Sequence, residues 1–153
     1  MLPAARIEAV IDLMQAVLAA ERPADAVVSA YFRDRRFIGS KDRAAVAERT
    51  YGVLRSHARF GWWVERVGLP DTPRSRVLIW CALGDGADAK RLKDLFDGSK
   101  HGPAELSADE LSAISKLSGQ TLDHPDMPAE IRAECPELYA EKLKAYFGDA
   151  FEA

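Results

Sequence analysis

Apolar residues recur at intervals of three and four along most of this chain, which is the spacing of helices that bury one face. The pattern predicts helices over residues 4–21, 24–36 and 40–67. The third either runs unbroken or breaks near Ser56–Gly61, because a glycine in a helix interior weakens it. No segment alternates apolar and polar residues as a half-buried strand would. The expected fold class is therefore all-α.

Residues with known preferences for helix ends mark where the helices should begin. Ser40 is the expected N-cap of the third helix, with an acidic residue, Asp42, in its first turn. The remaining predicted helices are one that starts at Thr72-Pro73 and contains the apolar run 77–83, one over 88–97, one that starts with the capping box Ser107–Glu110, and two short ones from Pro128 and Pro136 to about 134 and 147. We expect residues 1–97 to form a helical bundle, and residues 98–153 to form a linker followed by connector helices.

The predicted third helix has two unlike faces. On a helical wheel one side carries a core face, made of Val46, Thr50, Val53, His57, Phe60 and Val64. The opposite side, within an arc of about 80° on the same count, carries a stripe of arginines and aromatic rings, made of Tyr51, Arg55, Arg59, Trp62 and Arg66. Guanidinium groups interleaved with rings bind phosphates and stack on bases. The same spacing also fits a solvated helix face whose rings are simply buried.

Positive charge is concentrated in the first half of the chain. Residues 1–80 carry 13 basic and 9 acidic side chains, a net charge of +4, whereas residues 81–153 carry 8 and 15, a net charge of −7. Arginine suits bidentate phosphate contacts better than lysine. Further basic residues that could widen the stripe into an RNA-binding patch are Arg33, Arg35, Arg36, Lys41, Arg43 and Arg49.

Composition and length fit a globular domain without a membrane span. Of 153 residues, 48% are hydrophobic and 29% charged, and the longest apolar runs fall far short of the roughly 20 residues that a span needs. The first residues lack the unbroken apolar stretch of a signal peptide, so a cytoplasmic location is expected. The two cysteines, far apart in sequence, suggest no disulfide framework.

The residues that usually carry catalysis do not form a recognisable set. His57 falls on the core face, and His101 and His124 lie in predicted loops without partners at metal-ligand spacing. Cys81 sits in an apolar run, as a packing thiol does. We find no nucleophile with a base beside it and no glycine-rich cofactor loop. A binding module is the expected class, with no metal and no cofactor.

Two motifs carry a resemblance to a known family. Lys41-Asp-Arg, followed by Tyr51-Gly-Val-Leu-Arg55 and by Trp62-Trp63, resembles the N-terminal domain of the Sun/Nop family of RNA cytosine-C5 methyltransferases. The segment from Cys135-Pro-Glu-Leu to Gly148 is similar to the helix that precedes the catalytic domain in that family. The resemblance implies a NusB-like helical bundle that positions RNA, with ribosomal RNA as the expected partner.

The family's chemistry resides in a domain that these residues do not include. The resemblance implies that methyl transfer uses S-adenosylmethionine and two cysteines on a following Rossmann-like domain. Neither Cys81 nor Cys135 has the Pro-Cys or Thr-Cys-Ser context of those cysteines. We therefore expect the reading frame to continue past Ala153, and the missing catalytic domain to be a further partner. The alternative is a helical protein-interaction module that binds a protein partner or docks on the catalytic domain.

The sequence lacks both a glycine-rich cofactor loop and the family's catalytic-cysteine contexts, and this leads to a first test. These 153 residues should neither transfer methyl groups nor bind S-adenosylmethionine. Isothermal titration calorimetry with S-adenosylmethionine should give only heats of dilution. Saturable binding in the micromolar range would contradict the expectation.

Overall fold

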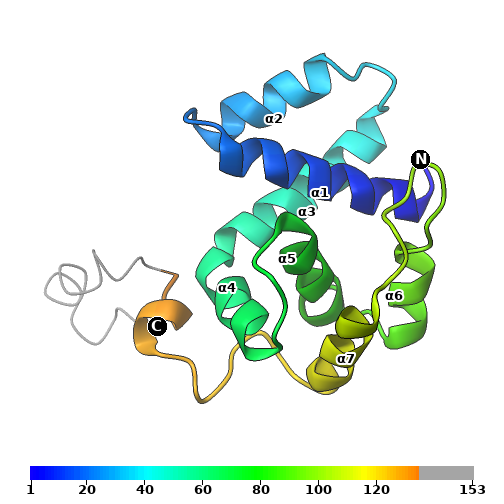
Figure 1. The fold of residues 1–153 in the computed structure, drawn as a ribbon. Coiled ribbons are helices and arrows are strands. Elements are labelled where there is room, and N and C mark those ends of the chain that lie inside the picture. The colour runs from blue at the N-terminus through cyan, green and yellow to red at the C-terminus, as the bar shows by residue number, and fades with distance from the viewer. Residues whose placement is uncertain (135–153) are drawn as a thin grey trace, which may run out of the picture.

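The computed structural model describes residues 1–134, and all regular structure among them is helical (Figure 1). The elements, in chain order, are α1 (Pro3–Ala19), α2 (Ala24–Arg33), α3 (Ser40–Arg55), α4 (His57–Arg66), α5 (Pro73–Ile79), the single π-helical turn η1 (Trp80–Gly84), α6 (Ala89–Leu95), α7 (Ala108–Leu117) and α8 (Ala129–Arg132). The all-α class is confirmed. The predicted helix from Pro136 to 147 lies outside the described residues.

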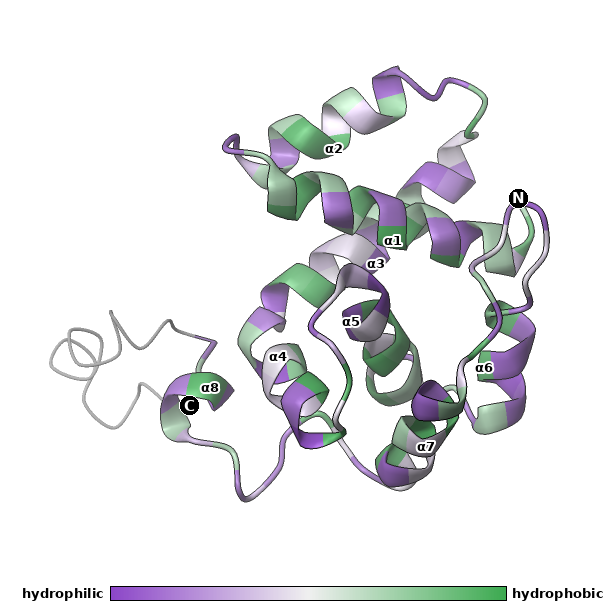
Figure 2. Cartoon of the chain, in the orientation of Figure 1, coloured by the Kyte–Doolittle hydropathy of each residue, from purple (hydrophilic) through white to green (hydrophobic). Residues whose placement is uncertain are grey.

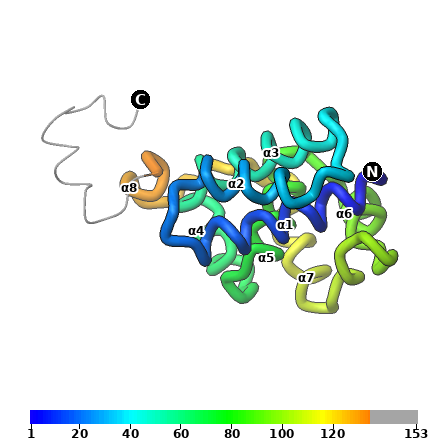
Figure 3. Tube along the Cα trace, turned by 90° about the horizontal axis from the view of Figure 1, so that it is seen from above, coloured from blue at the N-terminus to red at the C-terminus, as the bar shows by residue number. Residues whose placement is uncertain are grey.

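The core is organised around α5. Its residues Val77, Leu78 and Ile79 are completely buried, and in Figure 2 the helix passes from hydrophilic residues at its start to hydrophobic residues at its end. Helices α1 and α4 pack directly against it, and α1 also packs against α2, α3 and α6. Seen from above in Figure 3, α8 lies at one end of the molecule and α6 at the other. None of the described helices is long and apolar enough to cross a membrane.

Two glycines allow residues of the α5–η1 segment to approach the neighbouring helices closely. A Cβ atom at Gly52 of α3 would lie 3.0 Å from the indole Nε1 of Trp80, and one at Gly61 of α4 would lie 2.9 Å from a terminal nitrogen of Arg76. Both distances are too short for a real side chain without movement of the neighbour. The glycine in the Tyr51–Arg55 motif therefore allows the Trp80 ring to pack closely against α3.

The predicted third helix does not run unbroken to residue 67. It breaks at Ser56, within the range 56–61 where a break is the alternative prediction. Ser56 leaves the helical region with φ −110° and ψ 28°. The break is stabilised from outside the helix, because the Glu134 carboxylate accepts hydrogen bonds from the freed amides of Ala58 (2.7 Å) and Arg59 (3.1 Å). Gly61 lies inside α4 and does not cause the break.

Several helix ends differ from their predicted positions. Gly39, not Ser40, is the N-cap of α3, and no side chain caps that end. Helix α2 ends at Arg33, earlier than predicted, because Arg43 donates hydrogen bonds to the carbonyl oxygens of Phe32 (3.1 Å) and Ile38 (2.7 Å) and so holds the following turn. The start at Thr72-Pro73 is confirmed, since the Thr72 hydroxyl accepts a hydrogen bond from the amide of Ser75 at 3.1 Å.

Residues beyond 97 pack on the same core. Ala113, Ile114 and Leu117 of α7, together with Met127, are buried in the cluster that α1 and α5 also enter. The capping box is confirmed, with reciprocal hydrogen bonds between Ser107 and Glu110 of 3.2 and 2.9 Å. The domain boundary at residues 97–98 stays a prediction.

The core face of α3 provides a stability test. Val53 is fully buried, so Val53→Asp would place an unpaired carboxylate among apolar side chains and should lower the free energy of unfolding by about 3 kcal/mol or more. Ala44→Asp, at an exposed position of the same helix, is the matched control and should change stability little. Urea unfolding followed by circular dichroism measures both. A Val53→Asp protein as stable as its parent would contradict this packing.

The second test concerns the buried carboxylate of Glu110. Burial alone would raise the pKa of this group, but hydrogen bonds from Arg74 (2.8 and 3.0 Å) and Ser107 outweigh burial and lower the pKa. Because the folded pKa is the lower one, the stabilisation is fully present above about pH 4.5 and is lost as the pH falls through the folded value.

Glu110→Gln should therefore lower the free energy of unfolding at pH 7 by about 1–3 kcal/mol, and its difference from the parent should shrink in acid. Asp109→Asn removes a neighbouring carboxylate that is exposed in the first turn of α7. That control should cost less than about 1 kcal/mol. Thermal melts over a pH series measure the effect, and a difference that grows toward low pH would contradict the assignment.

Candidate nucleic-acid interface

The stripe of arginines and aromatic rings is divided between two helices. Tyr51 and Arg55 lie on α3, and the other three members lie on α4 beyond the break at Ser56. The opposite face is buried as predicted at Val46, Thr50, Val53, Phe60 and Val64. His57 is a correction to that face, because it is exposed at the first position of α4.

Arg59 is held by carboxylates from the end of the described chain. Its Nε donates to Glu134 at 2.6 Å, one terminal nitrogen donates to Asp123 at 2.9 Å, and the other donates to the Ser56 hydroxyl at 3.0 Å. Partial burial alone would lower the pKa of Arg59, but these hydrogen bonds outweigh burial and raise the pKa. The side chain is only 21% exposed. The chain's own acidic residues thus occupy the place where a phosphate would bind.

The α4 end of the stripe is covered in the same way. Arg66 donates to Asp126 at 2.9 Å, and its guanidinium carbon lies 5.1 Å from the centroid of the Trp62 ring. The Trp62 ring also packs against His124 at 5.1 Å. Arginine and ring do pair here, as the stripe suggested, but a loop of the same chain supplies the anion and the ring contact.

The two members on α3 differ from each other. The Tyr51 hydroxyl donates to Asp25 of α2 at 2.6 Å, and this hydrogen bond raises the pKa of Tyr51. Arg55 is exposed, and within residues 1–134 its guanidinium makes no hydrogen bond or ion pair. Arg55 is therefore the stripe residue most open to a ligand in the described part of the chain.

Two of the additional predicted arginines also have partners. Arg35 stacks on the Tyr31 ring, 3.8 Å from its centroid, and lies 3.6 Å from Asp12. Arg49 faces Asp85 at 3.7 Å and lies 5.8 Å from the centroid of Trp80. Both are partly buried, so structural contacts already engage these guanidinium groups.

The remaining arginines meet in one groove between α2 and α3. Arg33, Arg36 and Arg43 line an open groove of about 800 Å³, together with Val28, Ser29, Phe32, Ala44 and Ala47. Arg33 and Arg36 are exposed, and no carboxylate belongs to the groove lining in the described residues. Lys41 is exposed in the first turn of α3 and does not line the groove. The structure thus brings three predicted arginines onto one surface of uncompensated positive charge.

Cys81 and His57, of the residue types that most often carry catalysis, take part in packing and hydrogen bonding here. Cys81 is fully buried, which raises the pKa of its thiol to about 12 and keeps it protonated. His57 is exposed as a whole residue, but its Nδ1 lies 3.2 Å from Arg76 in a part-buried contact. Desolvation of the ring there and the positive charge of Arg76 lower the pKa of His57. Within residues 1–134 no three His, Cys, Asp or Glu side chains are grouped as metal ligands. Cys135 lies outside the described residues.

Two arginines outside the predicted RNA-binding set also reach a surface pocket. Arg6 of α1 and Arg91 of α6 line it together with Arg49. The three are separated by more than 40 positions in sequence, so no local motif links them. The acidic partners of the stripe had a signal: the −7 charge of residues 81–153 against the +4 of residues 1–80.

Comparison with known protein families, with curated proteins and with solved structures gives no match for this chain. The function is therefore inferred from the charges and contacts of the described residues and from the sequence motifs.

Proposed function

We propose that this chain binds RNA through the groove between α2 and α3 and serves as the RNA-positioning domain of an RNA cytosine-C5 methyltransferase. The observation that carries the proposal is the groove itself. Arg33, Arg36 and Arg43 line it without a carboxylate beside them, and Arg33 and Arg36 have no ion-pair partner within residues 1–134. Uncompensated arginines on one surface attract the phosphate backbone of RNA.

The groove also has an apolar lining beside its arginines. Its floor includes Phe32, Ala44 and Ala47, and the guanidinium of Arg43 lies 5.7 Å from the centroid of the Phe32 ring. Arg43 is held in place by the carbonyl oxygens of Phe32 and Ile38. A fixed guanidinium beside two exposed ones suits a backbone contact that does not depend on base sequence.

The stripe plays a smaller part in this proposal than the sequence suggested. Arg59 and Arg66 are neutralised by Asp123, Asp126 and Glu134, so RNA would have to displace these carboxylates before it could contact the two arginines. Among the three arginines of the stripe, only Arg55 has no hydrogen-bond or ion-pair partner in the described residues. RNA contacts at Tyr51, Trp62, Arg35, Lys41 and Arg49 stay predictions.

The methyltransferase context rests on the motifs. The resemblance of Lys41-Asp-Arg and Tyr51-Gly-Val-Leu-Arg55 to the Sun/Nop family supports a NusB-like domain, and the packing of Gly52 against Trp80 gives that motif a structural reason. In this proposal S-adenosylmethionine and the catalytic cysteines belong to a following domain. The chain's role is to hold ribosomal RNA in register for that domain.

A second candidate function is docking to a protein, either the catalytic domain or another partner. An apolar surface favours it: Phe37 is 81% exposed and Leu2 75% exposed. Both line a cavity of about 780 Å³ between the start of α1 and the loop that precedes α3. Exposed apolar surface of this kind is typical of interaction sites.

Salt dependence distinguishes the groove from the stripe. Binding of a structured ribosomal RNA fragment through three arginines should give a slope of about −2 to −3 in a plot of log affinity against log salt. Arg33→Ala with Arg36→Ala should flatten that slope by about 1.5, because two phosphate contacts are lost. Arg59→Ala with Arg66→Ala should change it by much less, because their charges are already compensated.

Lys90→Ala with Lys93→Ala is the matched control, since it removes two exposed positive charges from α6, outside the groove. Fluorescence anisotropy over a salt series measures all four proteins. Equal flattening by the lysine pair would mean that only net charge matters. Flattening by the stripe pair alone would place RNA on the stripe, and no change in any variant would favour the docking function.

A further inference from the structure

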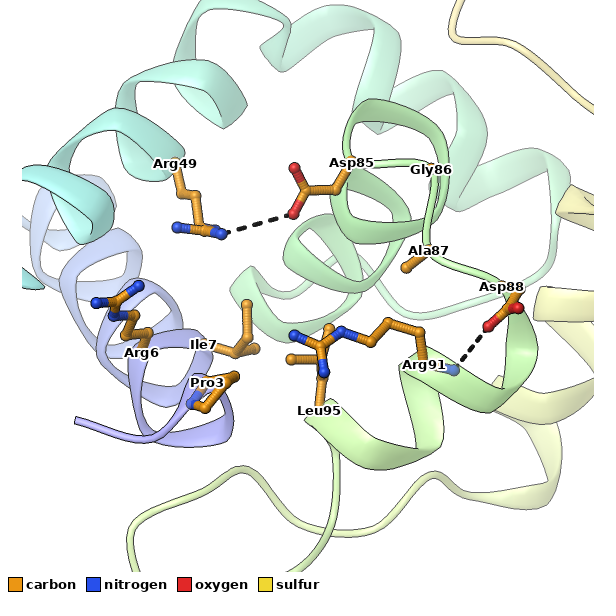
Figure 4. A pocket seen from close by; sticks show the side chains of 10 residues that line it. All are labelled: Pro3, Arg6, Ile7, Arg49, Asp85, Gly86, Ala87, Asp88, Arg91 and Leu95. Atoms are coloured by element: carbon orange, nitrogen blue, oxygen red, sulfur yellow. Dashed lines mark hydrogen bonds and ion pairs between the residues drawn. The ribbon is translucent and has the colours of Figure 1, made fainter.

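A pocket on the other side of α3 gathers three arginines from three helices. Arg6 of α1, Arg49 of α3 and Arg91 of α6 line a cavity of about 330 Å³ (Figure 4). The Arg91 side chain extends from α6 toward α1, and Ile7 and Leu95 supply apolar lining. The volume is at the small end of the range for ligand pockets.

The arginines of this pocket have more hydrogen-bond donors than the protein supplies acceptors. Arg6 uses only its Nε, which donates to Asp42 at 2.7 Å. The buried Nε of Arg49 has no acceptor within the described residues, and neither does the guanidinium of Arg91. Guanidinium donors that have no acceptor on the protein favour a ligand that brings several acceptor oxygens.

The carboxylates of the pocket do not meet this need. Asp85 lies 3.7 Å from a terminal nitrogen of Arg49, which is longer than a charge-assisted hydrogen bond of about 2.7–2.9 Å. Asp88 accepts a hydrogen bond from the backbone amide of Arg91 at 2.8 Å and so caps α6. The one carboxylate that faces Arg49 is therefore loosely held and can be displaced.

We propose that this pocket binds a phosphate group, held between Arg6, Arg49 and Arg91. Guanidinium groups that three helices contribute to one pocket suit a tetrahedral anion, whose oxygens point in several directions, better than a carboxylate with two oxygens on one side. The phosphate belongs either to a small molecule or to the end of an RNA strand. The site is separate from the groove between α2 and α3 and does not depend on RNA binding there.

Titration with inorganic phosphate at constant ionic strength tests the site. Amide chemical shifts of residues 86–91 and the Nε–H signal of Arg49 should change saturably. Arg91→Gln should weaken phosphate binding by about tenfold or more, because a charged hydrogen-bonding group is lost from the site. Arg91→Lys keeps the positive charge but lacks the planar guanidinium, so its phosphate affinity should lie between those of the parent protein and Arg91→Gln.

Lys90→Gln removes the same charge from the neighbouring residue, which does not line the pocket. It should weaken binding by less than about twofold, since an exposed charge is screened. Equal weakening by Lys90→Gln and Arg91→Gln would overturn the proposal, and so would shifts no larger than those caused by chloride.

A short RNA with and without a 5′-phosphate distinguishes the two sources. If the phosphorylated strand alone shifts residues 86–91, the ligand is an RNA end. If inorganic phosphate and a nucleoside monophosphate do so and neither RNA does, the ligand is a small phosphate compound. The assignment would be overturned if neither RNA shifted the amide signals of residues 86–91 and inorganic phosphate failed to shift them saturably. Failure of the groove variants to affect RNA binding would leave this result unchanged.

Discussion

The buried guanidinium of Arg76 is the group on which the arrangement of α4 and α5 depends. Its side chain is 7% exposed and donates to Asp71 at 2.7 and 3.1 Å and to the His57 carbonyl oxygen at 2.6 Å. Gly61 leaves the space that it fills. A buried charge deprived of its partners costs several kcal/mol, so these contacts fix how α4 begins against α5. The position of α4 then determines where the rest of the stripe lies.

Charge in this molecule is compensated unevenly, and that unevenness underlies the functional proposals. Residues 123–134 neutralise the arginines of α4, whereas α2 and the start of α3 receive no such carboxylates in their groove. The pocket between α1, α3 and α6 lies between these extremes, because Arg6 is paired with Asp42 at 2.7 Å whereas Arg49 is paired with Asp85 only at 3.7 Å. The surfaces available to an anion are the ones that the chain's own acidic residues leave open.

The sequence identified the arginines of the predicted stripe but not the groups that they contact. The interactions that occupy Arg59 and Arg66 span 75, 64 and 60 positions, and local periodicity carries no information at such separations. Arg33, Arg36 and Arg43 are predicted only as additions to the stripe, yet they line an open groove of their own. Arg6 and Arg91 were missed because they converge only through the packing of α1 and α6.

The sequence by itself determined the helices, because the spacing of apolar residues, the Thr72-Pro73 start and the Ser107–Glu110 capping box are local signals. It also determined which face of α3 enters the core. Only the tertiary structure decided where the long predicted helix breaks, because Glu134 stabilises the new helix start from 75 or more positions away. The same holds for which arginines stay free, since this depends on where distant carboxylates fold back onto the helices.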